Sequence, residues 1–321
     1  MDVGDAERWV DARLAERAER RTGPVELVRS RPWGEVAKAE SSVGTVWLKA
    51  PGPTTSFEVP LYGLLDKASP RSVLTPLGVD PERGWVLLPD GGPTLGERTE
   101  GAARVEGLIA TLRRYARVQR DMEPYSDRLL EMGIADMRPQ LILTRFDEAV
   151  AFSRHYAKTS GSERDMKSVE EVATHRGSIA KWAAELERAP GRATLDHNDL
   201  HPWNVLGNPE QPETIRFYDW GDATVAHPFA SAALPLGMIE REQPRALSRA
   251  RDAYLDAFQD VGAHADLVRI LELACRCAKV ARAHTWERAI RLAGKDAPED
   301  FRRAPLESLE SVLDETYTSR T

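Results

Sequence analysis

The 321-residue sequence contains little cysteine, no long apolar run and no excess of basic residues. Its two cysteines, Cys275 and Cys277, lie two positions apart in a segment with a helical pattern. That spacing points them to different sides of a helix, which disfavours a mutual disulfide and predicts buried free thiols. Free thiols suit a reducing environment, so we expect the protein to be cytoplasmic. The first twenty residues are too charged for a signal peptide, and no apolar segment approaches the length of a membrane span.

The charge balance disfavours one class of partner. The chain carries 44 Lys and Arg against 51 Asp and Glu, a net charge of −7. Broad nucleic-acid binding depends on neutralising phosphates with basic side chains, so we expect no nucleic-acid partner. An acidic balance instead suits a cationic small molecule, although charge alone does not identify it. The length allows two lobes with separate cores, and it leaves both a monomer and a homodimer open.

The chain changes character near residue 90, from β-rich to helical. In the first part we predict a helix at 5–21, strands at 25–29, 36–39, 45–49, 72–77 and 85–88, and a helix at 57–68. The turn-forming segment Leu88–Pro93 suits a hinge. Beyond it we predict helices at 102–121, 126–133, 138–157, 163–189, 243–261, 264–293 and 305–317. The pattern therefore predicts an α+β fold of two lobes, residues 1–90 and residues 91–321.

Two motifs in the second part carry candidate chemistry. The first is His197-Asn198-Asp199-Leu200-His201-Pro202-Trp203-Asn204, and the second is Phe217-Tyr218-Asp219-Trp220-Gly221-Asp222. Phosphoryl transfer from ATP needs an Asp to orient and deprotonate a hydroxyl, and an Asn and an Asp to hold Mg²⁺. The protein kinase signature H-R-D-x-x-x-x-N followed by D-F-G has the same spacing. We predict Asp199 as the catalytic base and Asn204 and Asp219 as magnesium ligands, although Asp199 or Asn204 taken alone would suit a structural turn.

The variant H-x-D-L-H-P-x-N with D-W-G-D resembles the aminoglycoside phosphotransferase family of kinase-like enzymes. The resemblance runs from about Val25 to Ala293 and is strongest at 195–206 and 215–223. It implies a bilobal protein-kinase-like fold, with a small β-rich nucleotide-binding lobe and a larger, mostly helical catalytic lobe. It also implies ATP, with GTP left open, Mg²⁺ and a small-molecule hydroxyl acceptor such as an aminoglycoside-like antibiotic, amino sugar or amino alcohol. No A-P-E segment follows Asp219, which disfavours a protein substrate.

The same resemblance assigns residues of the first part to nucleotide binding. Lys49 matches the phosphate-binding lysine, and Glu58 at the start of the next helix is its expected partner. Asp90 and Gly91 lie at the expected adenine-side hinge. Solvation of Lys49 and compensation of a helix dipole by Glu58 remain alternatives. The turn Ser30–Glu35, expected over the phosphates, has one glycine where kinases have G-x-G-x-x-G.

The acceptor pocket is expected among the C-terminal helices. Candidates by position are Asp222, Glu240, Glu272, His284, Trp286 and Glu287. Of these, Asp222, Glu272 and Trp286 are the predicted substrate-binding residues. Asp222 suits a position near the metal, a position in the acceptor pocket or a cap of the following turn, and Trp286 also suits the core.

Two other functions are compatible with parts of the sequence. A catalytically silent binding module would keep the fold, but the intact set Lys49, Asp199, Asn204 and Asp219 argues against it. A metal-dependent hydrolase would use His197, Asp199 and His201 as transition-metal ligands, although the remaining histidines are scattered singly. The hydrolase hypothesis predicts that His201→Ala harms activity more than Asn204→Ala, and the kinase hypothesis predicts the reverse.

Overall fold

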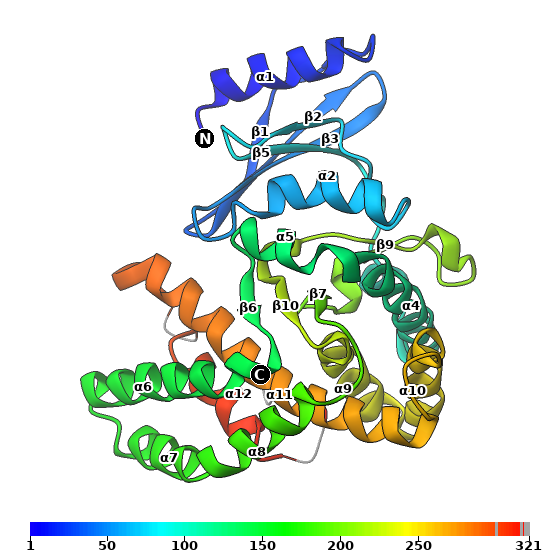
Figure 1. The fold of residues 1–321 in the computed structure, drawn as a ribbon. Helices are drawn as coiled ribbons and strands as arrows, with labels where there is room; N and C mark the ends of the chain where they lie inside the picture. Colours follow the sequence, from blue (N-terminus) through cyan, green and yellow to red (C-terminus); the bar gives the residue numbers. More distant parts are fainter. Residues whose placement is uncertain (299–300, 315–316, 318–321) are drawn as a thin grey trace.

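The computed structural model describes residues 1–298, 301–314 and 317 of the chain. Figure 1 shows a small lobe, drawn in blue, above a larger lobe made mostly of helices. The small lobe consists of α1 (Val3–Ala15), β1 (Glu26–Arg31), β2 (Gly34–Ser41), β3 (Gly44–Pro51), α2 (Glu58–Ala68), β4 (Gly78–Asp80) and β5 (Trp85–Pro89). Its strands form one antiparallel sheet in the order β1-β2-β3-β5-β4.

The period of two along the strands assigns each face of this sheet to a different neighbour. On β3, Val46 and Leu48 pack with Trp9, Val10 and Leu14 of α1 in one apolar cluster. The intervening side chains of β3 must therefore face away from α1. Lys49, the predicted phosphate-binding lysine, lies on that opposite face.

One predicted strand of the small lobe, residues 72–77, is wrong. The segment leaves the sheet: the Ser72 carbonyl accepts a hydrogen bond from Phe217 N–H at 2.8 Å, and the strand at this point, β4, begins only at Gly78. Pro76 has no N–H to donate, so the chain rejoins the sheet only where Leu77 N–H bonds to the Leu87 carbonyl.

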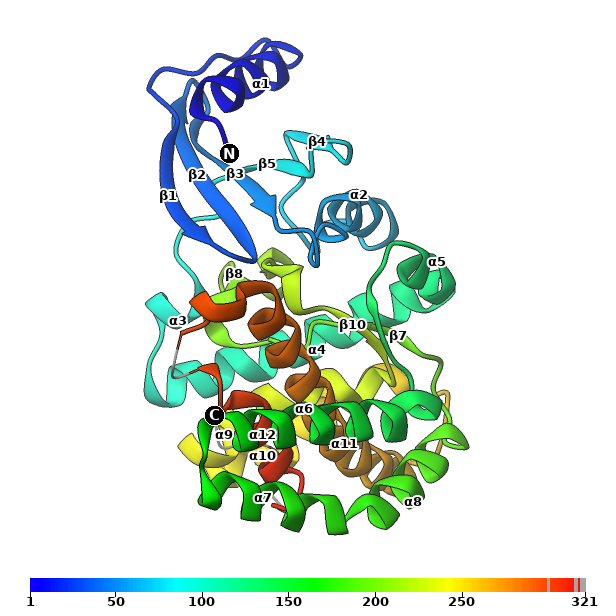
Figure 2. The same ribbon diagram turned by 90° about the vertical axis from the view of Figure 1, so that its left-hand side faces the viewer.

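The large lobe is built around one long helix, α11 (Figure 2). Its elements are α3 (Leu95–Arg98), α4 (Gly101–Met122), α5 (Ser126–Glu131), β6 (Ala135–Met137), α6 (Ile142–Ser160), α7 (Glu163–Thr174), α8 (Arg176–Glu187), β7 (Thr194–Asp196), β8 (Val205–Leu206), β9 (Arg216–Phe217), β10 (Thr224–Ala226), α9 (Ala233–Glu242), α10 (Leu247–Leu255), α11 (His264–Ala293) and α12 (Ala304–Ser311), with short 3₁₀ turns between them. The predicted helix at 163–189 is two helices, because the chain turns at His175, where His175 N–H bonds to the Val172 carbonyl. The helix predicted at 305–317 ends at Ser311, and residues 315–316 lie outside the described part of the chain.

The apolar core does not divide between the lobes. Phe57 and Leu61 at the start of α2 belong to the same buried cluster as Tyr115 of α4, Phe217 of β9 and Trp220. Helix α2 is therefore fixed to the large lobe as well as to the sheet. The predicted boundary at residues 90 and 91 stays a prediction.

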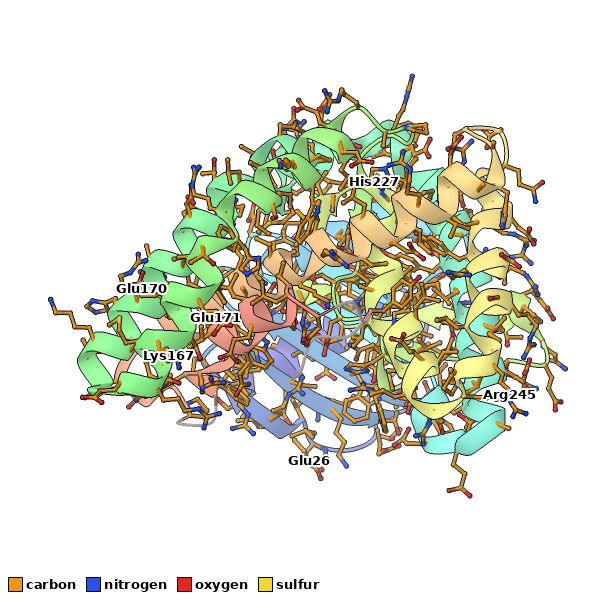
Figure 3. All side chains as sticks on the ribbon, turned by 90° about the horizontal axis from the view of Figure 1, so that it is seen from below. Glu26, Lys167, Glu170, Glu171, His227 and Arg245 are labelled. Carbon is orange, nitrogen blue, oxygen red and sulfur yellow. The ribbon has the colours of Figure 1, made fainter. Side chains whose placement is uncertain are left out.

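The remaining expectations from composition concern thiols, surface and membrane. Cys275 and Cys277 are buried free thiols, as predicted. Charged side chains such as Lys167, Glu170 and Arg245 are exposed on the outside of the large lobe (Figure 3). Among the described residues, no helix is both long enough and apolar enough to cross a membrane.

Candidate active site

The loop between β7 and β8 presents Asp199 to a cleft between the lobes. It starts from the buried carboxylate of Asp196, which accepts hydrogen bonds from Asn198 N–H at 2.8 Å and from Ser231 Oγ at 2.6 Å. Asn198 has a left-handed backbone with φ 58°, which Asn tolerates better than most residues. Its side-chain amide donates to Thr285 Oγ1 of α11 at 2.8 Å. The loop is thus held between the strand that precedes it and a helix far along the chain.

Asp199 and Asn204 are joined directly. Asn204 Nδ2 donates to the Asp199 backbone carbonyl at 2.9 Å and to Asp199 Oδ2 at 3.0 Å. His201 Nε2 lies 3.3 Å from the same carboxylate oxygen. Because its amide nitrogen is used on Asp199, Asn204 keeps its side-chain oxygen as an acceptor for another ligand.

Lys49 lies at the centre of a buried charge cluster. Its Nζ is 2.6 Å from Glu58 Oε1 and 2.6 Å from Asp219 Oδ1, and Glu58 Oε1 also accepts from Trp220 N–H at 3.0 Å. Burial disfavours the ammonium, but the two carboxylates outweigh burial and the pKa of Lys49 lies above its usual value. The Lys49 charge in turn lowers the pKa of Asp219. Lys49 and Asp219 are therefore both charged at neutral pH.

Arg282 of α11 contacts the predicted base, a residue that the sequence analysis missed. Its Nη1 donates to Asp199 Oδ1 and to the Asn198 carbonyl, both at 2.9 Å. Burial raises the pKa of Asp199, but the guanidinium and His201 outweigh burial and hold that pKa well below its usual range. Asp199 is consequently a carboxylate at neutral pH, and one of its oxygens is fixed by Arg282.

The cleft beside these residues has a volume of about 620 Å³, within the range of small-ligand sites. It is lined by Lys49, Asp199, Asn204 and Asp219 together with the apolar side chains of Val36, Leu74, Leu88 and Leu206 and with the segment Pro89–Gly92. An apolar space next to a row of charged groups suits a nucleotide, with its base among the apolar side chains and its phosphates near Lys49.

The predicted hinge residues lie on this cleft. Trp47 Nε1 donates to Asp90 Oδ1 at 3.1 Å, which fixes the hinge to β3. Gly91 approaches the opposite wall so closely that a Cβ there would lie 2.4 Å from Leu206 Cδ1. A larger residue at this position would therefore have to displace the Leu206 side chain from the wall of the cleft.

A second cavity, of about 210 Å³, continues from Asp199 toward α11. Trp33 of the β1–β2 turn, Trp286 of α11 and Phe301 line it, with ring centroids 6.1 Å apart for Trp33 and Phe301 and 5.1 Å apart for Trp286 and Phe301. Asp222 and Arg288 supply charge on the same wall. The turn predicted over the phosphates thus reaches the large lobe at this aromatic group.

Asp222 lies between two arginines without a close hydrogen bond to either. Its carboxylate oxygens are 3.6 Å from Arg282 Nη1 and 3.5 Å from Arg288 Nη2. Burial and the neighbouring Asp199 raise the pKa of Asp222 to about 6. Its charge therefore depends on pH and on what binds beside it.

The other acceptor candidates lie elsewhere. Glu272 pairs with Arg251 at 3.1 Å, Glu287 pairs with Arg291 at 2.7 Å, and Glu240 accepts from Tyr317 N–H. These three residues and His284 line neither cavity. The residues of α11 that do line the second cavity include Thr285, Trp286, Arg288 and Ala289. Periodicity alone does not reveal that face, because the face that reaches the site depends on how α11 packs in the lobe.

The histidine motif does not converge on a common ligand. His197 is buried, its Nε2 is 3.1 Å from the Tyr218 carbonyl, and its ring lies 4.6 Å from that of Trp220. Burial lowers its pKa to about 4, so it is neutral and braces the segment before Asp219. Within the described residues, no three His, Cys, Asp or Glu side chains form a metal-ligand group. The arrangement of His197 and His201 therefore does not favour the hydrolase hypothesis.

The oxygen atoms at the cleft fit Mg²⁺. Asn204 keeps its side-chain oxygen free of the Asp199 contact, and Asp219 uses Oδ1 on Lys49, which leaves Oδ2. Both are hard donors, and Mg²⁺ bound by one or two protein oxygens is completed by phosphates and water. These two side chains therefore have the chemistry of a site for magnesium and phosphate together.

Comparison with known proteins identifies one matching family model. A model described as the phosphotransferase enzyme family matches residues 49–267, which include Lys49, Asp199, Asn204 and Asp219. No curated protein sequence matches the chain.

Several solved structures share the fold at low identity. A type I macrolide 2'-phosphotransferase has a TM-score of 0.57 and 15% identity, over 96% of this chain and 98% of its own. An ethanolamine kinase of Plasmodium vivax has a TM-score of 0.61 and 12% identity, over 90% of this chain and 82% of its own. A spectinomycin phosphotransferase in complex with ADP and spectinomycin has a TM-score of 0.54 and 10% identity, over 98% of each chain. At such identities these likenesses concern the fold.

Proposed function

Because the chain belongs to the phosphotransferase enzyme family, we propose that it transfers the γ-phosphoryl group of ATP to a hydroxyl of a small molecule, with Mg²⁺. The predicted family, the bilobal kinase-like fold and the class of small-molecule phosphotransferase are confirmed. The observation that carries the finer proposal is that Lys49, Asp199, Asn204 and Asp219 line a single cleft.

The proposed work of each residue follows from its contacts. Asp199 accepts a hydrogen bond from the acceptor hydroxyl, orients it, and takes its proton as the bond to phosphorus forms. Arg282 keeps Asp199 ionised and fixed. Lys49, already held between Glu58 and Asp219, donates to phosphate oxygens without having to be ordered first.

Asn204 Oδ1 and Asp219 Oδ2 are the proposed magnesium ligands. Magnesium, when bound, neutralises charge on the phosphate oxygens. The contribution of the chain is to hold the two oxygens still. Asn204 is tied to Asp199, and Asp219 is tied to Lys49 and takes a left-handed backbone with φ 61°.

The acceptor is proposed to bind in the aromatic cavity beside Asp199. The names of similar structures mention macrolide, kanamycin, spectinomycin and ethanolamine, and one is a complex with GDP. Trp33, Trp286 and Phe301 suit a ring or an apolar body, and Asp222 suits an amine. Hydroxylated antibiotics, amino sugars and amino alcohols are thus the classes to test, with both ATP and GTP. A cytoplasmic location remains part of the proposal.

The test is acceptor-dependent ADP formation in the presence of Mg²⁺ across those classes, with Asp199→Asn as the central variant. We expect turnover to fall about 10³-fold in Asp199→Asn, because the general base is lost. The Kd for ATP, measured by calorimetry, stays within about threefold, because Asp199 is assigned to the hydroxyl and not to the nucleotide.

The outcomes separate the hypotheses. Tight ATP binding without turnover on any acceptor class would favour the silent binding module. The absence of nucleotide binding would overturn the kinase proposal. Greater loss of activity in His201→Ala than in Asn204→Ala would favour the hydrolase hypothesis over the kinase proposal.

A further inference from the structure

Outside the cleft, arginines gather on the face formed by α4, the turn after α2 and the segment before β9. Arg71, Arg113, Arg114 and Arg117 line a cavity of about 370 Å³ together with Pro70, Pro212 and Glu213. Arg216 of β9 lies close enough for its charge to act on Arg71 and Arg114. We call these five residues the arginine cluster. Its cavity shares no residue with the two cavities of the cleft.

The arginine cluster has little counter-charge, although the charge of nearby Asp121 acts on Arg114. Among the described residues, none of its five members takes part in an ion pair, whereas nearby Arg120 pairs with Glu123 and Asp260. Glu213 is the one carboxylate that lines the cavity. Burial and the neighbouring guanidiniums lower the pKa of both Arg114 and Arg216. Such crowding of like charge is unexpected in a chain of net charge −7, and it is relieved by a bound anion.

Main-chain carbonyls position two of these side chains. Arg114 Nη2 donates to the Pro70 carbonyl at 3.4 Å, and Arg216 Nη1 donates to the Glu213 carbonyl at 2.8 Å. Arg71 adopts a left-handed backbone with φ 65°, a conformation that residues other than glycine rarely adopt. Arg114 Nε is buried with no hydrogen-bond partner. Guanidinium groups that are held in place and keep unused N–H donors, as in Arg114, are suited to bind an anion.

We propose that the arginine cluster binds a small anion that carries two or more phosphate groups. Guanidinium groups match phosphate oxygens with paired donors, and several of them compensate a multiply charged ligand better than a single carboxylate. The cavity volume suits a small ligand and not an extended polymer, and the negative charge of the chain as a whole disfavours nucleic acid. This site does not depend on the proposed kinase activity.

The arginine cluster includes Arg216 of the β8–β9 hairpin, which lies in the chain between the proposed magnesium ligands Asn204 and Asp219. Arg216 pairs with Leu206 in the β8–β9 ladder, and the Ser72 carbonyl accepts from Phe217 N–H. An anion that contacts Arg71, Arg114 and Arg216 therefore joins the turn after α2, helix α4 and strand β9. Binding is expected to raise the melting temperature of the whole chain.

The experiment measures binding of inorganic tripolyphosphate to the full chain by calorimetry, without divalent cations and at low salt. The test variant is Arg113→Gln/Arg117→Gln, which alters two exposed side chains one helical turn apart on α4. The matched control is Arg164→Gln/Lys167→Gln, two exposed basic residues of α7, which lies on the other side of the large lobe (Figure 1). Melting curves without ligand establish that both variants fold.

We expect wild type and control to bind one equivalent with similar Kd, and the test variant to bind at least about tenfold more weakly. Binding should weaken as salt is added, and orthophosphate should bind less tightly than tripolyphosphate. Equal Kd values for wild type and the test variant, or no binding by wild type, would overturn the site. Equal affinity for orthophosphate and tripolyphosphate would overturn the requirement for more than one phosphate group.

Discussion

The proposed nucleotide side of the cleft, around Lys49, and the proposed acceptor side, around Asp222, differ in how their charges are paired. On the nucleotide side, Lys49 contacts Glu58 and Asp219 at 2.6 Å each, so the group is fully formed before any ligand arrives. On the acceptor side, Asp222 stands 3.5 Å or more from Arg282 and Arg288, among aromatic rings.

This difference suggests separate roles for the two sides, one in the reaction chemistry and the other in the choice of substrate. A charge cluster with ideal contacts is preorganised for one task, which suits phosphates that are the same in every turnover. Loose ion pairs among aromatic side chains can exchange partners when a ligand enters. The acceptor side is therefore where we expect specificity to be set, and substitutions should affect the two sides in different measurements.

The largest effect of the four tests should come from Lys49→Met, which breaks the nucleotide side. We expect ATP affinity to fall about 30-fold, corresponding to the loss of about 2 kcal/mol of charged hydrogen bonding. The free energy of unfolding should fall by about 2 kcal/mol, because the carboxylate of Glu58 stays buried without its partner. Calorimetry and urea unfolding measure the two quantities.

Lys38→Met is the matched control for that test, since Lys38 pairs with Glu26 at 3.6 Å on the exposed sheet surface. It should change neither quantity beyond experimental error. If Lys38→Met lowered ATP affinity and the free energy of unfolding as much as Lys49→Met, both effects would come from the total charge of the small lobe and not from the contacts of Lys49.

Arg282→Met tests the contact that joins the two sides through Asp199. We expect kcat to fall about tenfold, since Asp199 loses one fixed hydrogen bond. The pKa of Asp199 should rise toward its usual value. Since the base works as a carboxylate, the acidic limb of the kcat profile should move to higher pH. Arg291→Met, on the same helix but paired with Glu287, is the control, and an unmoved pH profile in Arg282→Met would contradict the assignment.

Trp286→Ala should separate the two sides of the cleft, because it should change acceptor binding and leave ATP binding unchanged. We expect the acceptor KM to rise about fivefold, the value of an aromatic contact, while the Kd for ATP stays unchanged. Trp182→Ala is a matched control, because Trp182 lies beneath Arg276 as Trp286 lies beneath Arg282, and Trp182 lines neither cavity. A change in the Kd for ATP with no change in acceptor KM would contradict the assignment of Trp286 to the acceptor side.

The smallest effect concerns Asp222→Asn and the pH dependence of stability. The pKa of Asp222, about 6 in the folded chain, lies above its value in an unfolded chain, so the native protein binds a proton more readily. Stability from this group is present at low pH and is lost as pH rises from about 4 through about 6. Relative to wild type, Asp222→Asn should therefore gain up to about 1 kcal/mol between pH 5 and pH 8 in urea unfolding, a figure reduced for the partial exposure of the side chain.

Glu272→Gln is the control for Asp222→Asn. Glu272 was a predicted acceptor residue, but its carboxylate pairs with Arg251 and lines neither cavity. We expect no change in acceptor KM. An increased acceptor KM in Glu272→Gln would contradict its placement outside the site.

Local spacing accounts for the part of the site that could be predicted. Asp199 and Asn204 are close because five residues of one loop join them, and alternation along β3 sends Lys49 to the face opposite α1. The same reasoning failed at residues 72–77. There, an apolar segment that suits a strand bonds at Ser72 to β9 of the other lobe, and only Leu77 at its end bonds to the sheet.

Residue types at fixed covalent spacing around Asp199 and Asp219 were enough to predict a small-molecule phosphotransferase. They were not enough to predict which part of α11 reaches the cleft. Arg282 contacts a carboxylate 83 residues earlier, and Glu272 on the same helix does not reach the site. The physical reason is that no local pattern encodes the position of α11. That position follows from burial of its apolar side chains among the surrounding helices, which is a property of the whole lobe.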